Sequence, residues 1–215
     1  MKRILWIVFA VLAVGVGVYP AMYLLTDMSG GLLSSKSREL IEQFAWNLAF
    51  YSHIATGGIA LLTGWSQFIT SLKRRYVKLH RRLGTIYVAA CLSSGVAAFY
   101  LAIYASTGVV ASLGFGALAV SWITSTLLAY TAARQKMFSS HGAWMTRSFA
   151  LTFAAVMLRI YLPLAEVAGI SFDTSYPVIS YLCWVPNLLA AEFFSRRRRV
   201  RRARLSGDLA LLPGK

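Results

Sequence analysis

The sequence has few charged residues, very few acidic ones and almost no cysteine. Charged side chains make up 13% of its 215 residues, with only seven Asp or Glu, whereas a soluble domain carries roughly 25%. The two cysteines, Cys91 and Cys183, lie inside apolar runs, which excludes a secreted disulfide framework and a Cys-x-x-Cys metal site. The chain also lacks an H-E-x-x-H zinc motif, a glycine-rich phosphate loop and a Ser/His/Asp set. These absences argue against a soluble domain and against the enzymes that such motifs mark.

Long apolar runs dominate the chain instead. Hydrophobic residues account for 58% of it, and the mean hydropathy is +0.61. An apolar run of about 20 residues is long enough to cross a bilayer as a helix. Six such runs are present, at residues 1–25, 44–69, 83–104, 110–131, 141–164 and 176–194. We therefore predict an all-α, polytopic transmembrane helix bundle of six spans, with a four-helix core made by spans two to five.

The predicted organisation follows from these runs. The first run is longer than the ~7–15 residue core of a signal peptide, which indicates an uncleaved span. The expected parts are a first transmembrane span (1–25), an external loop (26–43), a four-helix membrane core (44–166), an external loop with the sixth span (167–195) and a basic cytoplasmic tail (196–215). We expect a short surface helix near residues 37–43 and disorder after the last arginine.

The positive charge lies almost entirely between or after the apolar runs. A net charge of +15 would also fit nucleic-acid binding, but this placement is typical of topology signals, so the predicted partner is the lipid bilayer and not nucleic acid. Only Lys36 and Arg38 lie in the external loop, on the side opposite to the other cations outside the spans. An even number of spans places both termini on one side, and the positive-inside rule makes that side the cytoplasm.

Each of the three histidines begins a stripe of small or polar residues at helical spacing. The stripe of His53 contains Gly57, Ala60, Gly64, Gln67 and Ser71. The stripe of His80 contains Gly84, Tyr87, Cys91, Ser94 and Ala98. The stripe of His141 contains Met145, Ser148, Thr152, Ala155 and Arg159. Such residues let helix backbones approach closely in lipid, so one interpretation is that the stripes only pack helices.

The predicted topology sorts these residues by depth. With a rise of ~1.5 Å per residue, His53 lies roughly 13 Å below the external end of its span, and Arg159 lies roughly 8–10 Å below the same surface. These two side chains would therefore meet in the outer half of the bundle. His80 and His141 both lie at the cytoplasmic boundary, with Gln67 near the same level.

Two kinds of chemistry would use these residues. Haem b is held by histidines from two helices at similar depth, so His80 and His141 are the predicted metal ligands. A glycine beside such a ligand, as Gly84 is beside His80 and Gly57 beside His53, would leave room for a macrocycle, and an arginine such as Arg159 would pair with a propionate of a haem at its own depth. The other chemistry is proton handling or quinone binding, because histidine titrates near neutral pH.

The remaining alternative needs no cofactor. Interfacial histidines contact lipid headgroups or backbone carbonyls. Arg147 is expected to extend its side chain to the cytoplasmic surface. The aromatic residues near span ends are expected to form an interfacial belt. They are Trp46, Trp65, Tyr76, Trp144 and Tyr176.

Three motifs carry a family resemblance. They are His53 with Gly57, Gly64 and Gln67; Lys78-Leu79-His80-Arg81-Arg82-Leu83-Gly84-x-x-Tyr87; and Ser140-His141-Gly142-x-Trp144-Met145-x-Arg147-Ser148 with the later Arg159. Together, over about residues 45–163, they resemble domain-of-unknown-function family 2306, a bacterial membrane family. The resemblance implies a multi-pass protein of the bacterial inner membrane and brings no established activity. More loosely, the chain is similar to cytochrome b561-type proteins, but those use two histidine pairs, so three histidines support one haem at most.

The functional hypothesis from the sequence is therefore membrane redox. A haem b held by His80 and His141 would serve quinone or a redox partner protein, and His53 and Arg159 would line a second, outer site. The competing class is a non-enzymatic accessory or assembly protein whose stripes only pack helices. A solute transporter is disfavoured, because no span has a central Gly/Pro break.

Overall fold

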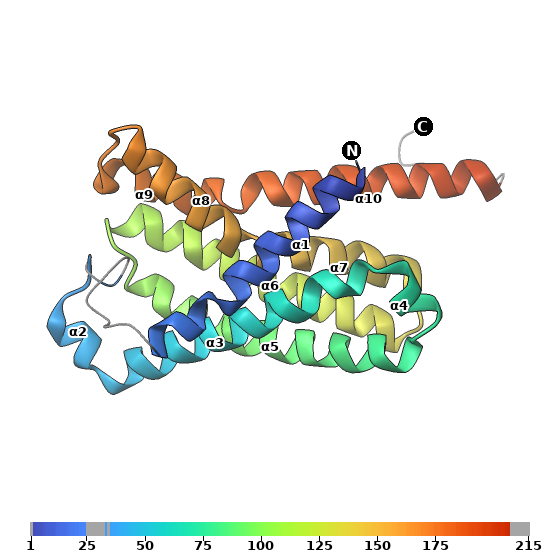
Figure 1. Cartoon of the computed structure of the whole chain (residues 1–215), viewed down its shortest axis with the longest axis horizontal. Helices are drawn as coiled ribbons and strands as arrows, with labels where there is room; N and C mark the ends of the chain where they lie inside the picture. The colour runs from blue at the N-terminus through green and yellow to red at the C-terminus, as the bar shows by residue number, and fades with distance from the viewer. Residues whose placement is uncertain (1, 25–32, 34, 207–215) are drawn as a thin grey trace.

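The computed structural model describes residues 2–24, 33 and 35–206, and its regular elements in these ranges are all helices. In chain order they are α1 (Lys2–Val18), η1 (Tyr19–Leu24), α2 (Arg38–Glu42), α3 (Phe44–Gly64), η3 (Trp65–Phe68), α4 (Thr70–Arg74), α5 (Val77–Ile103), α6 (Val109–Arg134), α7 (Phe138–Thr152), α8 (Ala154–Val167), α9 (Phe172–Leu182) and α10 (Val185–Ser206) (Figure 1). The predicted all-α transmembrane bundle is confirmed. So is the short surface helix, α2, whose N-cap Ser37 accepts a hydrogen bond from the Leu40 amide.

Five helical stretches of the described chain are long and apolar enough to cross a membrane. They are Ile4–Ala21, Val77–Ile103, Val109–Arg134, Phe138–Val167 and Phe172–Arg197. The second predicted span, α3, is not among them, although it has 21 residues, because polar side chains such as Asn47 and His53 lower its apolarity. α3 lies alongside α5 in the bundle (Figure 1), and its His53 contacts Ser94 of α5. The count of six spans is therefore approximate.

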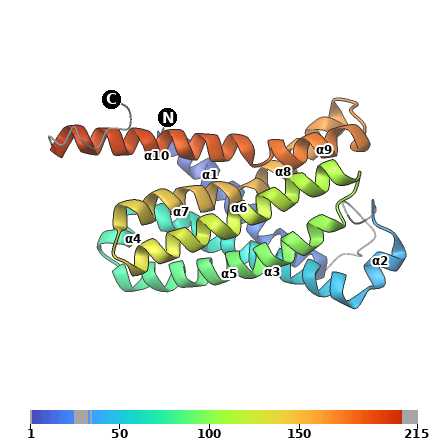
Figure 2. The same cartoon turned by 180° about the vertical axis from the view of Figure 1, so that it is seen from behind.

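The core of the bundle is formed by α3, α5, α6 and α7. α3 packs on α5, α5 on α6 and α6 on α7, while α1 crosses α3 obliquely (Figures 1 and 2). At that crossing, a Cβ added to Gly58 would lie 2.6 Å from the carbonyl oxygen of Gly17, so the two backbones touch there. Close approach through small residues is a common means of helix association in lipid.

The fifth predicted span is bent at Phe153, where α7 ends and α8 begins. Thr152 Oγ1 donates a hydrogen bond of 2.9 Å to the Ser148 carbonyl one turn earlier, a contact that often bends helices. Further on, Pro163 lies inside α8 and cannot donate to the Arg159 carbonyl. The bend directs α8 toward α9 and leaves α7 packed on α6.

The three stripes face the bundle interior over most of their length. Met145, Ser148 and Thr152 are buried, as are Tyr87 and Cys91. The stripe glycines contact neighbouring helices. A Cβ on Gly64 would lie 2.4 Å from the Phe149 ring, and one on Gly84 would lie 3.4 Å from Gln67 Oε1. These stripes are thus helix-packing faces, whatever else they do.

The basic C-terminal segment is helical as far as the structure describes it. α10 continues through Arg196 to Ser206 and extends past the end of the bundle (Figure 1). A helix persists there because it carries no Gly or Pro and continues directly from the membrane-spanning part. The disorder expected after Arg204 is wrong for Leu205 and Ser206, which end α10, and residues 207–215 lie outside the described part.

Candidate functional site

A cavity of about 230 Å³ lies inside the bundle between α1, α3, α5, α6, α8 and α9. We name it the His53 cavity. Its wall is mostly apolar, with Leu61, Leu118 and Trp122 among its residues, and Gly57 lies one turn from His53 on the same face. The volume lies somewhat below the ~300–1,000 Å³ typical of small-molecule sites. Such a site suits an apolar body with a small polar head.

Ser94 of α5 fixes the imidazole of His53. The Ser94 hydroxyl donates to the His53 carbonyl at 2.9 Å, and His53 Nδ1 lies 2.9 Å from Ser94 Oγ and 3.1 Å from the Ser94 carbonyl oxygen. Because the Ser94 hydroxyl proton is already donated to the His53 carbonyl, the two Ser94 oxygens near Nδ1 can only accept. The imidazole proton is therefore on Nδ1. Nε2 then holds a lone pair. Gly57 permits this arrangement, since a Cβ there would lie 3.1 Å from Ser94 Oγ.

Arg159 of α8 reaches the same cavity. Its Nη1 donates to the Ala155 carbonyl at 3.1 Å, and its guanidinium carbon lies 5.0 Å from the centre of the Tyr19 ring. Arg159 is near enough to act electrostatically on His53. Two predicted site residues from distant parts of the sequence therefore line one cavity.

Lys36 and Trp46 also line the His53 cavity. The Lys36 ammonium donates to the carbonyl oxygen of Tyr104, and burial lowers the pKa of Lys36. Trp46 is 2% exposed, and its Nε1 has no hydrogen-bond partner among the described residues. Sequence reasoning assigned Lys36 to an external loop and Trp46 to an interfacial belt. Nothing in the sequence separates them from residues of those ordinary kinds.

The charged side chains that line the cavity are basic. Its described lining residues include Lys36 and Arg159 and contain no Asp or Glu. With the indole N–H of Trp46, these groups present hydrogen-bond donors and positive charge to the interior. A bound molecule would therefore need oxygen acceptors, neutral or anionic, on an otherwise apolar frame.

The two remaining histidines lie at the other polar region of the bundle. His141 Nδ1 is 2.9 Å from the Ala129 carbonyl oxygen, which leaves Nε2 available. His80 is close enough to His141 for an electrostatic effect, and His80 Nδ1 is buried without a hydrogen-bond partner in the described chain. Neither histidine lines the His53 cavity. Gln67 is buried near this region, beside Gly84. Within the described residues, no group of three or more His, Cys, Asp or Glu is arranged to hold a metal ion.

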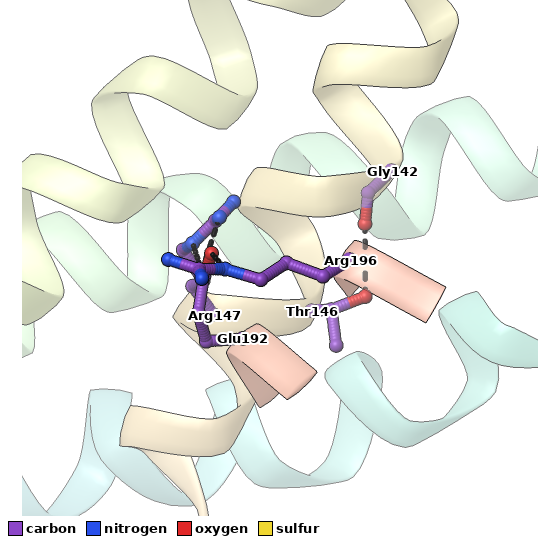
Figure 3. A network of polar contacts seen from close by, with 5 residues as sticks. All are labelled: Gly142, Thr146, Arg147, Glu192 and Arg196. Atoms are coloured by element: carbon purple, nitrogen blue, oxygen red, sulfur yellow. Dashed lines mark hydrogen bonds and ion pairs between the residues drawn. The ribbon is translucent and has the colours of Figure 1, made fainter. Parts of the chain in front are cut away.

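Arg147 does not simply extend toward the surface, as its position predicted. Its Nε lies 3.0 Å from Glu192 Oε2 of α10, and Arg196 Nε lies 2.9 Å from Glu192 Oε1 (Figure 3). The Arg147 guanidinium also stacks over the Trp144 ring at 4.5 Å. Glu192 was missed within the sixth predicted span, although a lone carboxylate in an apolar run is itself a signal for a cationic partner.

Comparison with known proteins gives one match. A family model described as "Predicted membrane protein (DUF2306)" matches residues 50–195, from the second turn of α3 into α10. No curated protein and no solved structure matches the chain. The matched region contains His53, His80, His141, Arg147, Arg159 and Glu192.

Proposed function

Because the chain belongs to the DUF2306 family of predicted membrane proteins, and is thus an integral membrane protein in contact with lipid, we propose that it binds a quinone in the His53 cavity and takes part in membrane redox chemistry. One observation carries this proposal. The cavity combines an apolar wall with His53 and Arg159, a hydrogen-bonding imidazole and a fixed cation. A quinone is complementary to this cavity, because it has an apolar ring and tail and carries oxygen atoms that accept hydrogen bonds.

His53 and Arg159 would play different parts toward such a ligand. With Nδ1 protonated against Ser94, His53 Nε2 can accept the proton of a quinol hydroxyl. Arg159 would donate to an oxygen of the oxidised or anionic form. Quinol oxidation releases two protons and two electrons. The electrons would pass to a redox partner protein or to a haem.

The proposed setting is the bacterial inner membrane, with both termini in the cytoplasm. The support is the charge distribution, since the cations of α4, the start of α5 and the end of α10 share one side. In this orientation the His53 cavity opens into the outer half of the membrane. His80 and His141 lie at the cytoplasmic boundary.

Binding of decylubiquinone to the protein in nanodiscs tests the proposal. Tryptophans that line the cavity, including Trp122, should report saturable binding through fluorescence quenching. Loss of a charged hydrogen bond of ~1.5–3 kcal/mol in Arg159→Gln should weaken affinity about 10- to 100-fold. Lys136→Gln, at an exposed cation outside the cavity, is the matched control. Absence of saturable quenching in the wild-type protein would refute quinone binding.

A haem b at His80 and His141 is the second candidate. The bond from His141 Nδ1 to the Ala129 carbonyl supports it, because this contact orients the ring and leaves Nε2 for a metal. A Soret band that disappears in His80→Ala and in His141→Ala would establish the site. A colourless preparation from haem-sufficient cells would exclude it. If neither quinone nor haem binds, the accessory or assembly role without a cofactor is favoured.

A further inference from the structure

The indole N–H of Trp46 differs in its hydrogen bonding from those of two other tryptophans in the bundle. Trp122 Nε1 donates to Thr152 Oγ1 and Trp184 Nε1 donates to the Ser180 carbonyl, both at 2.9 Å. Trp46 is more deeply buried than either, yet its Nε1 has no partner among the described residues. Buried polar groups in native proteins are nearly always paired, so such a group requires an explanation.

The surroundings of Trp46 hold its ring in place. The indole stacks on Phe50 of the same helix, with ring centres 5.2 Å apart and an angle of 8° between the planes. Trp46 precedes His53 by two helical turns, so both lie on the face of α3 that borders the cavity. The unpaired N–H is therefore on a fixed ring that lines an internal space.

Lys36 adds a second donor at the same wall. One of its three N–H groups donates a hydrogen bond to the Tyr104 carbonyl, which connects the segment before α2 to the end of α5. Ser35 Oγ lies 2.9 Å from Ser106 Oγ and strengthens this connection. The ammonium and the indole thus belong to a built wall of the cavity rather than to a solvated loop.

We propose that Trp46 and Lys36 are ligand-binding residues, and that the indole N–H of Trp46 donates a hydrogen bond to an oxygen atom of the molecule held in the His53 cavity. This inference deepens the proposed function and rests on occupancy of the same cavity. It requires a ligand whose oxygen acceptor lies between these donors. Both the carbonyl of a quinone and the carboxylate of a fatty acid have this chemistry.

Indole NMR of the ¹⁵N-labelled protein in nanodiscs tests the inference, with decylubiquinone and oleate as separate probes. The resonance that is absent from Trp46→Phe identifies the Trp46 N–H. A bound oxygen acceptor should move this resonance downfield. Trp46→Phe keeps the stacked ring but removes the donor, so it should bind the same probe about tenfold more weakly. Trp6→Phe, at a partly exposed ring outside the cavity, should bind like the wild type.

The outcomes separate the two proposals. A shift with decylubiquinone supports both, and a shift with oleate alone supports the role of Trp46 while overturning quinone as the ligand. If decylubiquinone binds but neither the Trp46 resonance nor the Trp46→Phe affinity changes, the role of Trp46 is wrong and quinone binding stands. If neither probe binds or moves the resonance, both proposals are overturned.

Discussion

Arg147 of α7 and Glu192 of α10 form an ion pair that joins two membrane-spanning stretches (Figure 3). Their side chains are 19% and 32% exposed, and Glu192 is shared with Arg196, whose side chain is 75% exposed. Both carboxylate oxygens are therefore used, one by each arginine. The ion pair connects α10 to the four-helix core, because α7 is the core helix against which α10 packs.

Glu192→Gln should destabilise the protein, since it leaves the less exposed Arg147 without its counter-charge. Breaking a fully buried pair costs ~3–5 kcal/mol and an exposed pair ~0–1 kcal/mol, so a partly exposed pair should cost about 1–3 kcal/mol. Thermal unfolding of the purified protein measures the effect. Arg196→Gln is the control and should change stability by less than about 1 kcal/mol. Equal effects of the two variants would contradict a specific role of the Arg147 pair.

Gly64→Ala should also be destabilising, for a steric reason. The new Cβ would lie 2.4 Å from the Phe149 ring and 2.6 Å from Tyr87, where α3 meets α5 and α7. Overpacking of this kind typically costs about 1–3 kcal/mol. Gly116→Ala is the matched control, because nothing lies within 4 Å of its added Cβ. Thermal unfolding should separate the two alanine variants, and a Gly64→Ala protein as stable as Gly116→Ala would show that the helices do not approach so closely.

Thr152→Val removes an acceptor from a buried polar cluster. Thr152 Oγ1 accepts from Trp122 Nε1 at 2.9 Å and lies 2.9 Å from the Tyr87 hydroxyl, which also contacts Ser148. The valine keeps the shape but leaves the indole N–H of Trp122 unpaired, at a cost of about 1–3 kcal/mol. Thr146→Val, where the hydroxyl only bonds the Gly142 carbonyl on an exposed turn, should be nearly neutral (Figure 3). Thermal unfolding or limited proteolysis can compare the stability of the two valine variants.

The predicted orientation can be tested with single cysteines. Arg75→Cys, between α4 and α5, should lie in the cytoplasm, and Asp173→Cys, at the start of α9, should lie outside. The native Cys91 and Cys183 are buried and should not react. An impermeant maleimide should label Asp173→Cys in intact spheroplasts and Arg75→Cys only after lysis. The reverse pattern would place the His53 cavity in the inner half of the membrane.

The helical fold was predictable because a bilayer leaves few alternatives. Length and apolarity identify the spans, and the polar stripes identify the faces that turn inward. The rise per residue also places both His53 and Arg159 in the outer half of the bundle, and they do line one cavity. The periodicity of polar and apolar residues describes one helix at a time. Predictions that concern a single helix face were therefore the most successful.

Features that depend on how separate segments meet were not predictable in this way. Lys36 lines the cavity while its ammonium contacts the Tyr104 carbonyl, and no pattern within residues 26–43 encodes that contact. The pairing of Arg147 with Glu192 depends on the position of α10 beside α7. That Trp46 Nε1 has no hydrogen-bond partner within the described part of the chain is a property of the packed structure, which no sequence pattern states.

Lys36 should make binding of an anionic ligand dependent on pH. Burial lowers its pKa below the usual value of 10.5, so the folded protein loses this charge at a lower pH than an exposed lysine would. Affinity for a long-chain alkanesulfonate, which stays ionised, should be full well below the lowered pKa and fall as pH rises through it. The same shift means that charged Lys36 reduces folding stability near neutral pH, a cost that disappears as pH rises toward 10.5. Lys36→Arg keeps its charge over this range, because arginine titrates only above about 12. Titration calorimetry at stepped pH should therefore show the fall in the wild type and not in Lys36→Arg, and parallel profiles would exclude Lys36 from the site.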